Sequence, residues 1–163
     1  MPAVLDELEQ LRRRVRELSD REEITDLVYR LGAVLDEGRF DELSAIFSED
    51  ATALTPGGLA EGRSALIAQA GRNHSPEERI QHVIGNVLVN VDGNRARVRA
   101  NLIATFAAEG ASEVRLAPAP RLILGEVYHF EAIRTGQGWR LSRVETTPVW
   151  ASQTETTPRP GDS

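Results

Sequence analysis

The sequence predicts an α+β domain in which three N-terminal helices pack in the concave face of a curved, mainly antiparallel sheet. Apolar residues recur at helical spacing over the first 70 residues, whereas four long segments after residue 80 are rich in valine, isoleucine, leucine and aromatic residues with a period of two. Hairpin turns at 92–94 and 135–138 make the neighbouring strands antiparallel. Such a sheet buries its apolar face against the helices and leaves a pocket between its concave face and the longest helix.

The composition indicates one domain, since 163 residues can bury a core without disulfides or metal ions. The chain has no cysteine, which excludes thiol nucleophiles and thiolate ligands, and no lysine, which excludes Schiff-base chemistry. The net charge of -6, without a basic stripe interleaved with aromatics, argues against nucleic acid as a partner. No segment approaches the roughly 20 apolar residues of a membrane span, and the acidic N-terminus does not resemble a signal peptide. We therefore expect a cytoplasmic protein with no membrane partner.

Residues 1–18 are predicted to form a helical arm with a narrow apolar seam. The seam recurs at heptad spacing opposite an arginine-rich side, and its residues are Val4, Leu8, Leu11, Val15 and Leu18. Two heptads are too few for a stable coiled coil, so we expect the arm to pack on its own domain or on a neighbouring subunit. Ser19 and Glu22 form a capping-box pattern, which predicts that a new helix begins there, nearly continuous with the arm, and Gly38 is placed to end it.

The domain itself is predicted to span residues 19–151. After the long helix, the pattern predicts a short helix at 40–47, a short strand at 51–54, a turn at 56–58 and a third helix at 65–70. The four long strands are predicted at 80–91, 95–107, 122–134 and 139–150. Residues 108–121 are predicted to be a longer loop, either mobile or a lid. The polar, proline-containing tail 152–163 is expected to be disordered.

The predicted strand 80–91 carries apolar residues on both faces. One face holds Ile80, His82, Ile84, Asn86 and Leu88, and the other holds Val83, Val87, Val89 and Val91. Helices cover only one side of the sheet, so the second apolar face predicts a subunit interface and therefore a homo-oligomer.

Asp36 and His82 are the strongest candidates for chemistry. In the helix that Gly38 ends, Asp36 lies on the border of the apolar stripe, and His82 lies early on the first long strand. A carboxylate that orients an imidazole leaves the neutral ring free to remove a proton. Alternatively, the aspartate is the base and the histidine stabilises an oxyanion. In a purely structural interpretation, Asp36 caps the helix and His82 is a hydrogen-bonded core residue.

Four further residues are candidates for substrate binding, and each has a structural alternative. Tyr29, on the long helix, can donate a hydrogen bond or fill the core. Asn86 can orient a ligand or pair with a neighbouring strand, and His129 can reach the pocket or pack on the sheet. Arg143 can bind an anionic group or form an ion pair with Glu145.

The sequence predicts neither a metal site nor a cofactor. The histidines at 74, 82 and 129 are scattered, without the HxH or HExxH spacing of metal sites. His74, in the polar segment NHSPEE, is interpreted as solvated. The glycine motifs of nucleotide-binding proteins and the GxSxG nucleophile motif are also absent from the sequence. An enzyme with this sequence should therefore work without a cofactor.

Four segments carry a family resemblance: REEITDLVYRLGAVLDEGRFDELSAIFSEDA, EGRSAL, QHVIGNVLVNVDGNRARVRA and GEVYHFEAIRTGQGWRLSRVE. Over about residues 19–151, they resemble the SnoaL-like group of the nuclear transport factor 2-like superfamily. The resemblance implies a cone-shaped α+β barrel in which three helices and a curved sheet enclose a deep apolar pocket. This superfamily contains scytalone dehydratase, hexachlorocyclohexane dehydrochlorinase, polyketide cyclases, limonene epoxide hydrolase and ketosteroid isomerase, and also non-catalytic binding modules.

The resemblance also implies a catalytic pair. In the dehydratase and dehydrochlorinase branch, an aspartate at the end of the first long helix acts with a histidine early on the following long strand. Asp36 in AVLDEGRFDEL and His82 in QHVIGN occupy these places. Leu31 stands where the dehydrochlorinase has a lysine, so a stabiliser of the leaving group is missing. The second histidine of scytalone dehydratase has only His129 as a candidate match.

These inferences together predict a cofactor-independent lyase or isomerase, either a dehydratase or a cyclase, for a hydrophobic polycyclic or polyketide-like molecule. His82, oriented by Asp36, is expected to remove a proton next to a carbonyl, with Tyr29 or Asn86 binding the oxygen. Two alternatives stay open. One is a non-catalytic binding or assembly module, in which Asp36 and His82 lie too far apart for a hydrogen bond. The other is an epoxide hydrolase in which Asp36 activates water.

Overall fold

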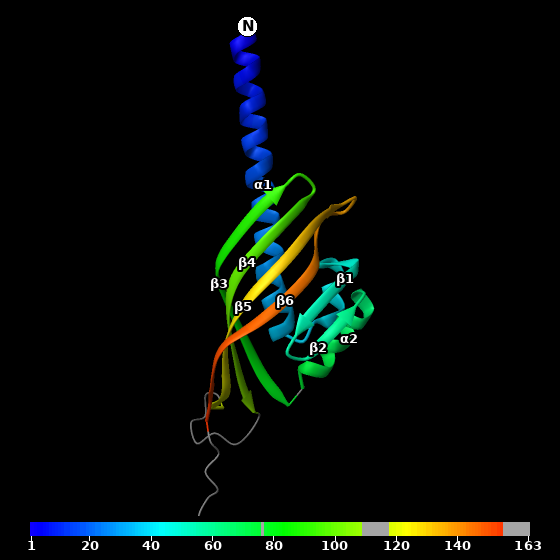
Figure 1. Ribbon diagram of the computed structural model, residues 1–163, viewed down its shortest axis with the longest axis vertical. Helices are drawn as coiled ribbons and strands as arrows, with labels where there is room; N and C mark the ends of the chain where they lie inside the picture. The colour runs from blue at the N-terminus through cyan, green and yellow to red at the C-terminus, as the bar shows by residue number, and fades with distance from the viewer. Residues whose placement is uncertain (76, 109–117, 155–163) are drawn as a thin grey trace, which may run out of the picture.

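One long helix lies against a single curved sheet (Figure 1). The structure is a computed structural model, and it describes residues 1–75, 77–108 and 118–154. Its helices are α1 (Pro2–Asp36), the 3-10 helix η1 (Phe40–Ala45) and α2 (Arg63–Asn73). Its strands are β1 (Phe47–Thr55), β2 (Gly58–Glu61), β3 (Glu78–Asp92), β4 (Arg95–Ala108), β5 (Pro120–Thr135) and β6 (Gly138–Gln153).

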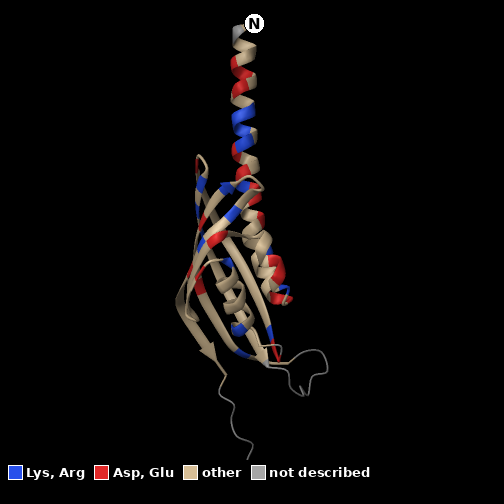
Figure 2. Ribbon diagram, turned by 90° about the vertical axis from the view of Figure 1, so that its right-hand side faces the viewer, with Lys and Arg blue, Asp and Glu red and all other residues tan. Residues whose placement is uncertain are grey.

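The sheet follows the order β2-β1-β6-β5-β4-β3 in the described part of the chain. The strands β3 to β6 form consecutive antiparallel pairs, while β1 pairs in parallel with β6 and antiparallel with β2. Figures 1 and 2 show the long strands curving around the C-terminal half of α1. The predicted α+β fold, with helices in the concave face of a mainly antiparallel sheet, is therefore confirmed.

The C-terminal half of α1 supplies the apolar stripe that the sheet covers. The stripe is at most 3% exposed and consists of Ile24, Leu27, Val28, Leu31 and Val34. Burying each such side chain contributes about 1.5–3 kcal/mol, so this stripe holds the helix on the sheet. Gly38 has a φ of +66° and follows the end of the helix, as predicted, because glycine adopts this left-handed conformation without steric cost.

The helix α1 runs without a break through Ser19, so the predicted helix start there is wrong. Residues 3–31 contain no glycine or proline that would interrupt a helix. Asp20 instead ties this part of α1 to the sheet. Its Oδ1 accepts a hydrogen bond from Trp139 Nε1 at 3.0 Å, and its Oδ2 accepts one from Arg134 Nη2 at 2.7 Å.

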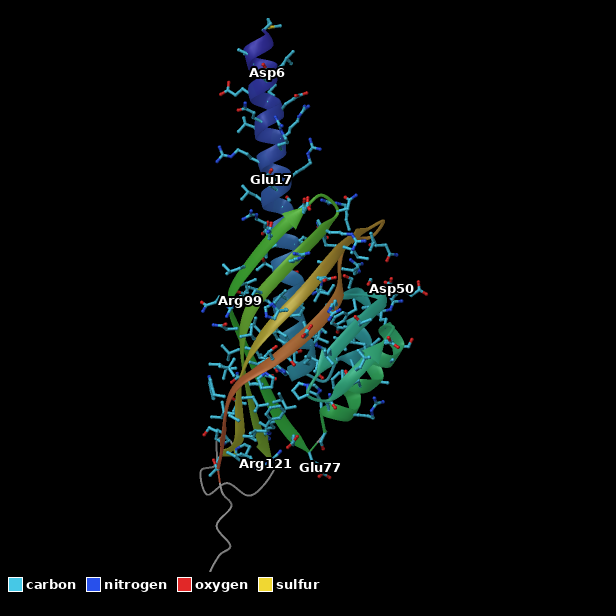
Figure 3. The ribbon with its side chains drawn as sticks, viewed as in Figure 1. Asp6, Glu17, Asp50, Glu77, Arg99 and Arg121 are labelled. Carbon is cyan, nitrogen blue, oxygen red and sulfur yellow. The ribbon has the colours of Figure 1, made fainter. Side chains whose placement is uncertain are left out.

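The N-terminal arm, residues 1–18, projects away from the domain (Figures 1 and 3). Its apolar seam is exposed along its whole length, from 44% at Leu8 to 66% at Leu18. The predicted packing of the arm on its own domain is therefore wrong, because no described surface of the chain faces the seam. Packing on a neighbouring subunit stays a prediction. Figure 2 shows arginines gathered along the middle of the arm.

Two short elements differ from the prediction. The segment 40–47 forms a 3-10 helix only as far as Ala45, and Phe47 already begins β1 with its side chain 1% exposed. The strand β1 is longer than the predicted 51–54, and it pairs with β2, which takes up the end of the predicted turn. The four residues of β2 are too few to display a period, so the sequence pattern does not reveal them.

A β-bulge reverses the two faces of β3 midway. Its pairing with β4 shifts between Gly85 and Leu88, and Asn86 has a φ of +49°. His82 lies on the inward face, but beyond the bulge that face belongs to Val87 and alternate residues after it, while Leu88 is 65% exposed. The strict alternation predicted for this strand is therefore wrong after the bulge, because one added residue shifts the period-two pattern by one position.

The outer face of the sheet exposes apolar side chains on neighbouring strands. Val83 is 56% exposed and pairs with Ile103, which is 42% exposed. Gly125 on β5 pairs with Ile103 on one side and with Trp150 of β6 on the other. Trp150 is 48% exposed. The predicted homo-oligomer rests on this face and stays a prediction.

The remaining predictions concern the chain ends and the longest loop. The strands extend into parts of the predicted loop 108–121 and of the predicted tail, since β4 reaches Ala108 and β6 reaches Gln153. Residues 118–119 and 154 are in neither a helix nor a strand, and residues 109–117 and 155–163 lie outside the described residues. No helix in the described ranges is long and apolar enough to cross a membrane.

Candidate active site

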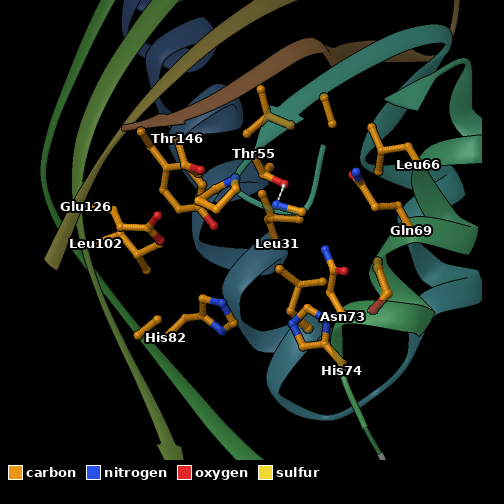
Figure 4. Close-up of a pocket in the computed structure, with 18 of the residues that line it drawn as sticks. Leu31, Thr55, Leu66, Gln69, Asn73, His74, His82, Leu102, Glu126 and Thr146 are labelled. Atoms are coloured by element: carbon orange, nitrogen blue, oxygen red, sulfur yellow. Dashed lines mark hydrogen bonds between the residues drawn. The ribbon is translucent and has the colours of Figure 1, made fainter. Parts of the chain in front are cut away.

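A cavity of about 350 Å³ lies between α1, α2 and the concave face of the sheet (Figure 4). Much of its wall is apolar, including Leu31, Leu43, Phe47, Leu66, Leu102 and Phe106. The polar side chains that the structure describes in this wall are Thr55, Gln69, Asn73, His74, His82, Glu126, Tyr128 and Thr146. An apolar cavity of this size with a few convergent polar groups is typical of a small-molecule site.

Asp36 and His82 meet at the edge of this cavity. His82 Nδ1 lies 2.6 Å from Asp36 Oδ1, and the backbone amide of His82 donates to the two carboxylate oxygens at 2.9 and 3.1 Å. The side chain of His82 is 7% exposed and lines the cavity. The side chain of Asp36 is 22% exposed and, among the described residues, is not part of the cavity wall. The structure thus brings together the two residues that the sequence singles out.

The carboxylate determines which ring nitrogen of His82 is available to a ligand. An ionised carboxylate only accepts hydrogen bonds, so the contact assigns the ring proton to Nδ1 and the free lone pair to Nε2. Gly32 allows α1 to approach β3 closely, since a Cβ at this position would lie 3.1 Å from Ile84 Cδ1 and 3.5 Å from His82 Cβ. The end of the helix and the strand therefore hold the imidazole in one orientation.

His74 is a second imidazole in the cavity wall, so its interpretation as a solvated residue is wrong. The helix α2 continues to Asn73, and His74 extends the face of Leu66 and Ala70 at a spacing of four. Its Nδ1 donates to the Ala70 carbonyl oxygen at 2.7 Å, and its ring centroid lies 5.9 Å from that of His82. Burial is the largest influence and lowers the pKa of His74, which favours the neutral ring. In the sequence, the spacing of four from Leu66 and Ala70 was the feature that could have placed His74 on the buried face of the helix.

Glu126, Tyr128 and Thr146 form a polar patch on the sheet wall, which the sequence analysis missed. Glu126 is 9% exposed, and its Oε1 has no hydrogen-bond partner among the described residues. Burial raises the pKa of Glu126, and the charge of His82 offsets this in part. Burial also raises the pKa of the Tyr128 phenol. The sequence feature that could have revealed this patch is the alternation along β5, which places Glu126, Tyr128 and Phe130 on one face.

The other four predicted site residues lie outside the cavity. Tyr29 is 49% exposed on α1, and Asn86 is exposed at the bulge, which turns it to the outer face. His129 is exposed on the outer face of β5. Arg143 is exposed, and its Nη2 lies 3.0 Å from Glu145 Oε2, so it forms the alternative ion pair. The predicted position of these residues in the pocket is therefore wrong. Tyr29 lies off the buried stripe of α1, and strand phase and the bulge direct the other three outward.

The arrangement is suited to acid-base chemistry. It presents a free imidazole nitrogen at His82, a second imidazole at His74 and a buried carboxyl group at Glu126 to one apolar space (Figure 4). In the described part of the chain, no group of three or more His, Cys, Asp or Glu side chains is arranged to hold a metal ion.

This chain is similar to known proteins in both sequence and fold. The family model described as SnoaL-like domain matches residues 16–145. The uncharacterized protein Rv2910c of Mycobacterium tuberculosis is 34% identical over 138 residues, which cover 81% of this chain and 88% of that protein.

Solved structures share the architecture. A putative scytalone dehydratase from Novosphingobium aromaticivorans has a TM-score of 0.69 at 19% identity, over 88% of this chain and 91% of that chain. Hexachlorocyclohexane dehydrochlorinase LinA-type3 from Novosphingobium barchaimii has a TM-score of 0.74 at 16% identity, over 88% of this chain and 96% of that chain. At these identities the likeness shows the fold alone.

Proposed function

The chain belongs to the SnoaL-like domain family, and from this premise we propose that it is a cofactor-independent lyase or isomerase for a hydrophobic small molecule. The proposed reaction is that of a dehydratase or a cyclase, and the proposed substrate is polycyclic or polyketide-like. The observation that carries the proposal is the 2.6 Å contact between His82 Nδ1 and Asp36 Oδ1, which leaves His82 Nε2 to a ligand.

His82 is the base in the proposed reaction. Its Nε2 takes a proton from a carbon next to a carbonyl group, and the electrons of that C–H bond move into an enol or enolate. Asp36 keeps the ring in the reactive tautomer and stabilises the imidazolium that forms. In a dehydration, a β-hydroxyl group takes this proton from the imidazolium and leaves as water, whereas return of the proton to another carbon completes an isomerisation.

The cavity supports a hydrophobic and uncharged substrate. Its volume of about 350 Å³ suits a small molecule, and no arginine or lysine is among the described residues that line it. A carboxylate or phosphate on the substrate would therefore lack a cationic partner. Leu31, 3% exposed, occupies the wall where a lysine would assist the departure of chloride, so dehydration has more support than dehydrohalogenation.

The named structural relatives also support an elimination. One is named a putative scytalone dehydratase and the other a hexachlorocyclohexane dehydrochlorinase, and both names describe the removal of a small leaving group. Because these likenesses establish only the fold, the reaction class of this chain rests on its own pair of residues.

Two alternatives have less support from the geometry. A binding module without chemistry was expected to keep Asp36 and His82 apart, and they lie within hydrogen-bond distance. An epoxide hydrolase would use Asp36 to activate water, but both oxygens of this carboxylate accept hydrogen bonds from His82.

The experiment is hydrogen–deuterium exchange at carbon 1 of 2-tetralone, a neutral bicyclic ketone, followed by NMR in D2O. The protein should accelerate this exchange, and His82→Ala should lower the catalysed rate by about 10²-fold or more. His129→Ala is the matched control, since this exposed histidine lies on the outer face, and its rate should equal that of the unchanged protein. A His82→Ala rate within a few-fold of the control would contradict the proposal.

A further inference from the structure

Two buried side-chain oxygens without a hydrogen-bond partner occur in the described part of the chain, and both point to one place. They are Glu126 Oε1 and Thr146 Oγ1, and both residues line the cavity. Most buried polar groups in folded proteins are hydrogen-bonded, so an unpaired group in a cavity wall indicates a partner that the ligand supplies. Figure 4 shows the side chains of both residues directed into the space that His82 also faces.

The strand β5 holds Glu126 at an irregular position in the sheet. Its pairing with β6 shifts between Gly125 and Glu126, and the residue opposite Glu126 is Pro148, which has no backbone N–H to donate. A bulge at this point changes the direction of nearby side chains and is often found next to active sites. The carboxyl group is thus directed into the cavity.

The surroundings of Glu126 favour its neutral form. The residue is 9% exposed, and the described cavity wall contains no arginine or lysine that would pair with a carboxylate. Burial of an unpaired carboxyl group penalises its charged form, so it favours the protonated form more than an exposed carboxyl group does. Burial, the larger influence, raises the pKa of Glu126 in the same direction, and nearby His82 lowers it in part.

Glu126 lies within reach of a ligand that His82 contacts. The register places His82 beside Ala104 on β4 and Glu126 beside Leu102 on the same strand, so His82 and Glu126 are two strands apart. Two strand spacings amount to about 10 Å, which leaves room for a ring system between the two side chains.

We propose that Glu126 is the general acid of this site, and that it donates its carboxyl proton to an oxygen of a neutral ketone while the Thr146 hydroxyl contacts the same oxygen. This role rests on the proposed function of His82 as the base. It specifies the substrate class as uncharged molecules with a carbonyl group at the Glu126 end and an acidic C–H bond at the His82 end.

The proton balance of the proposed step is complete. His82 Nε2 takes the proton of the C–H bond, the C–H electrons form a C=C bond, and the carbonyl oxygen takes the proton of Glu126 as its π electrons move onto it. The products are an enol, an imidazolium and a carboxylate. In a dehydration, the enol proton returns to Glu126 and the C=O bond forms again. The electrons of the enol C=C bond form a double bond between the α and β carbons, the β C–O bond breaks, and the hydroxyl takes the imidazolium proton to leave as water.

The first test is infrared difference spectroscopy of the free protein near pH 7. The spectrum of the unchanged protein minus that of Glu126→Gln should contain the C=O band of a protonated carboxylic acid. Glu131→Gln is the matched control, since Glu131 is exposed on the same strand and should contribute only carboxylate bands. A difference spectrum with carboxylate bands alone would overturn the proposal.

The second test uses 2-tetralone labelled with ¹³C at the carbonyl carbon. The carbonyl band of the bound ketone should lie at a lower wavenumber than in hexane, and this shift should be lost in Glu126→Leu, with the fold checked by circular dichroism. Loss of this donor should also lower the exchange rate by about 10²-fold. His82→Ala should keep the band shift while losing exchange.

The outcomes separate this inference from the proposed function. If exchange depends on His82 but the carbonyl band is the same in Glu126→Leu, or no bound band is seen, the role of Glu126 is wrong and the role of His82 stands. If the band shift depends on Glu126 and no exchange occurs, Glu126 is a donor to the ligand and the proposed reaction is wrong.

Discussion

Asp36 accepts hydrogen bonds from both the ring and the backbone amide of His82, 46 residues further along the chain. One carboxylate at the end of α1 therefore holds the position of β3 and the tautomer of the ring in the cavity. Displacement of this aspartate would therefore change both the position of β3 and the orientation of the imidazole.

Asp36→Asn should lower the exchange rate of 2-tetralone by more than about tenfold, because an amide can donate as well as accept and no longer selects the Nδ1–H tautomer. Nitrogen NMR of histidine-labelled protein should show one tautomer of His82 before the change and a mixture after it. Asp26→Asn is the control, since Asp26 is exposed on the same helix. An unchanged tautomer together with an unchanged rate would contradict the assigned role.

Acid should destabilise the protein in part through His74. Burial lowers the pKa of this histidine from the ordinary value of 6.5, so below about pH 6.5 the unfolded chain binds more protons than the folded one. The free energy of unfolding should therefore fall as the pH decreases through this range. His74→Gln removes this ionisable group. In urea titrations, its free energy of unfolding should fall less between about pH 7 and 5 than that of the unchanged protein. Equal losses in His74→Gln and in the exposed control His129→Gln would count against a buried, neutral His74.

Asp20→Ala should reduce the free energy of unfolding by about 1–3 kcal/mol. The substitution removes the acceptor of Trp139 Nε1, and Trp139 is 0% exposed, so its N–H would stay buried without a partner. It also removes the ion pair with Arg134. Chemical denaturation measures the loss, and Asp26→Ala provides an exposed comparison on the same helix. A loss no larger than that of the comparison would show that this anchor does not stabilise the fold.

Leu11→Glu should change the assembly of the protein and leave the fold of the domain intact. Leu11 is 53% exposed on the arm, so it has no described intramolecular packing to lose, while a second chain could cover it. Light scattering should show a lower molar mass, with an unchanged circular dichroism spectrum. Val83→Glu changes the exposed outer face of the sheet. If only this second variant lowers the mass, the interface lies on the sheet and not on the arm.

The sequence predicts the fold and the central pair for identifiable physical reasons. The helical stripe of α1 and the period of two in the long strands are strong signals, and both come from side chains that the core requires. Asp36 stands at the border of one pattern and His82 on the inward face of the other, so the two patterns together predict that they meet. The resemblance to the SnoaL-like family, now confirmed, places them in the same order.

The rest of the site depends on features that periodicity does not reveal. The bulge at Asn86 comes from the backbone of one residue, and it moves this asparagine from the expected inward face to solvent. His74 was missed because the end of α2 lies three residues beyond the predicted end. Glu126 alternates with apolar neighbours, but which face of β5 lines a cavity depends on the packing of the whole sheet.

The measurement that tests the proposed dyad most directly is the exchange rate of 2-tetralone with the double variant Asp36→Asn and His82→Ala, compared with both single variants. If Asp36 acts only through the ring of His82, the double variant should be as slow as His82→Ala alone. If the two losses multiply, the residues act independently, and the proposal that Asp36 positions a catalytic His82 is contradicted.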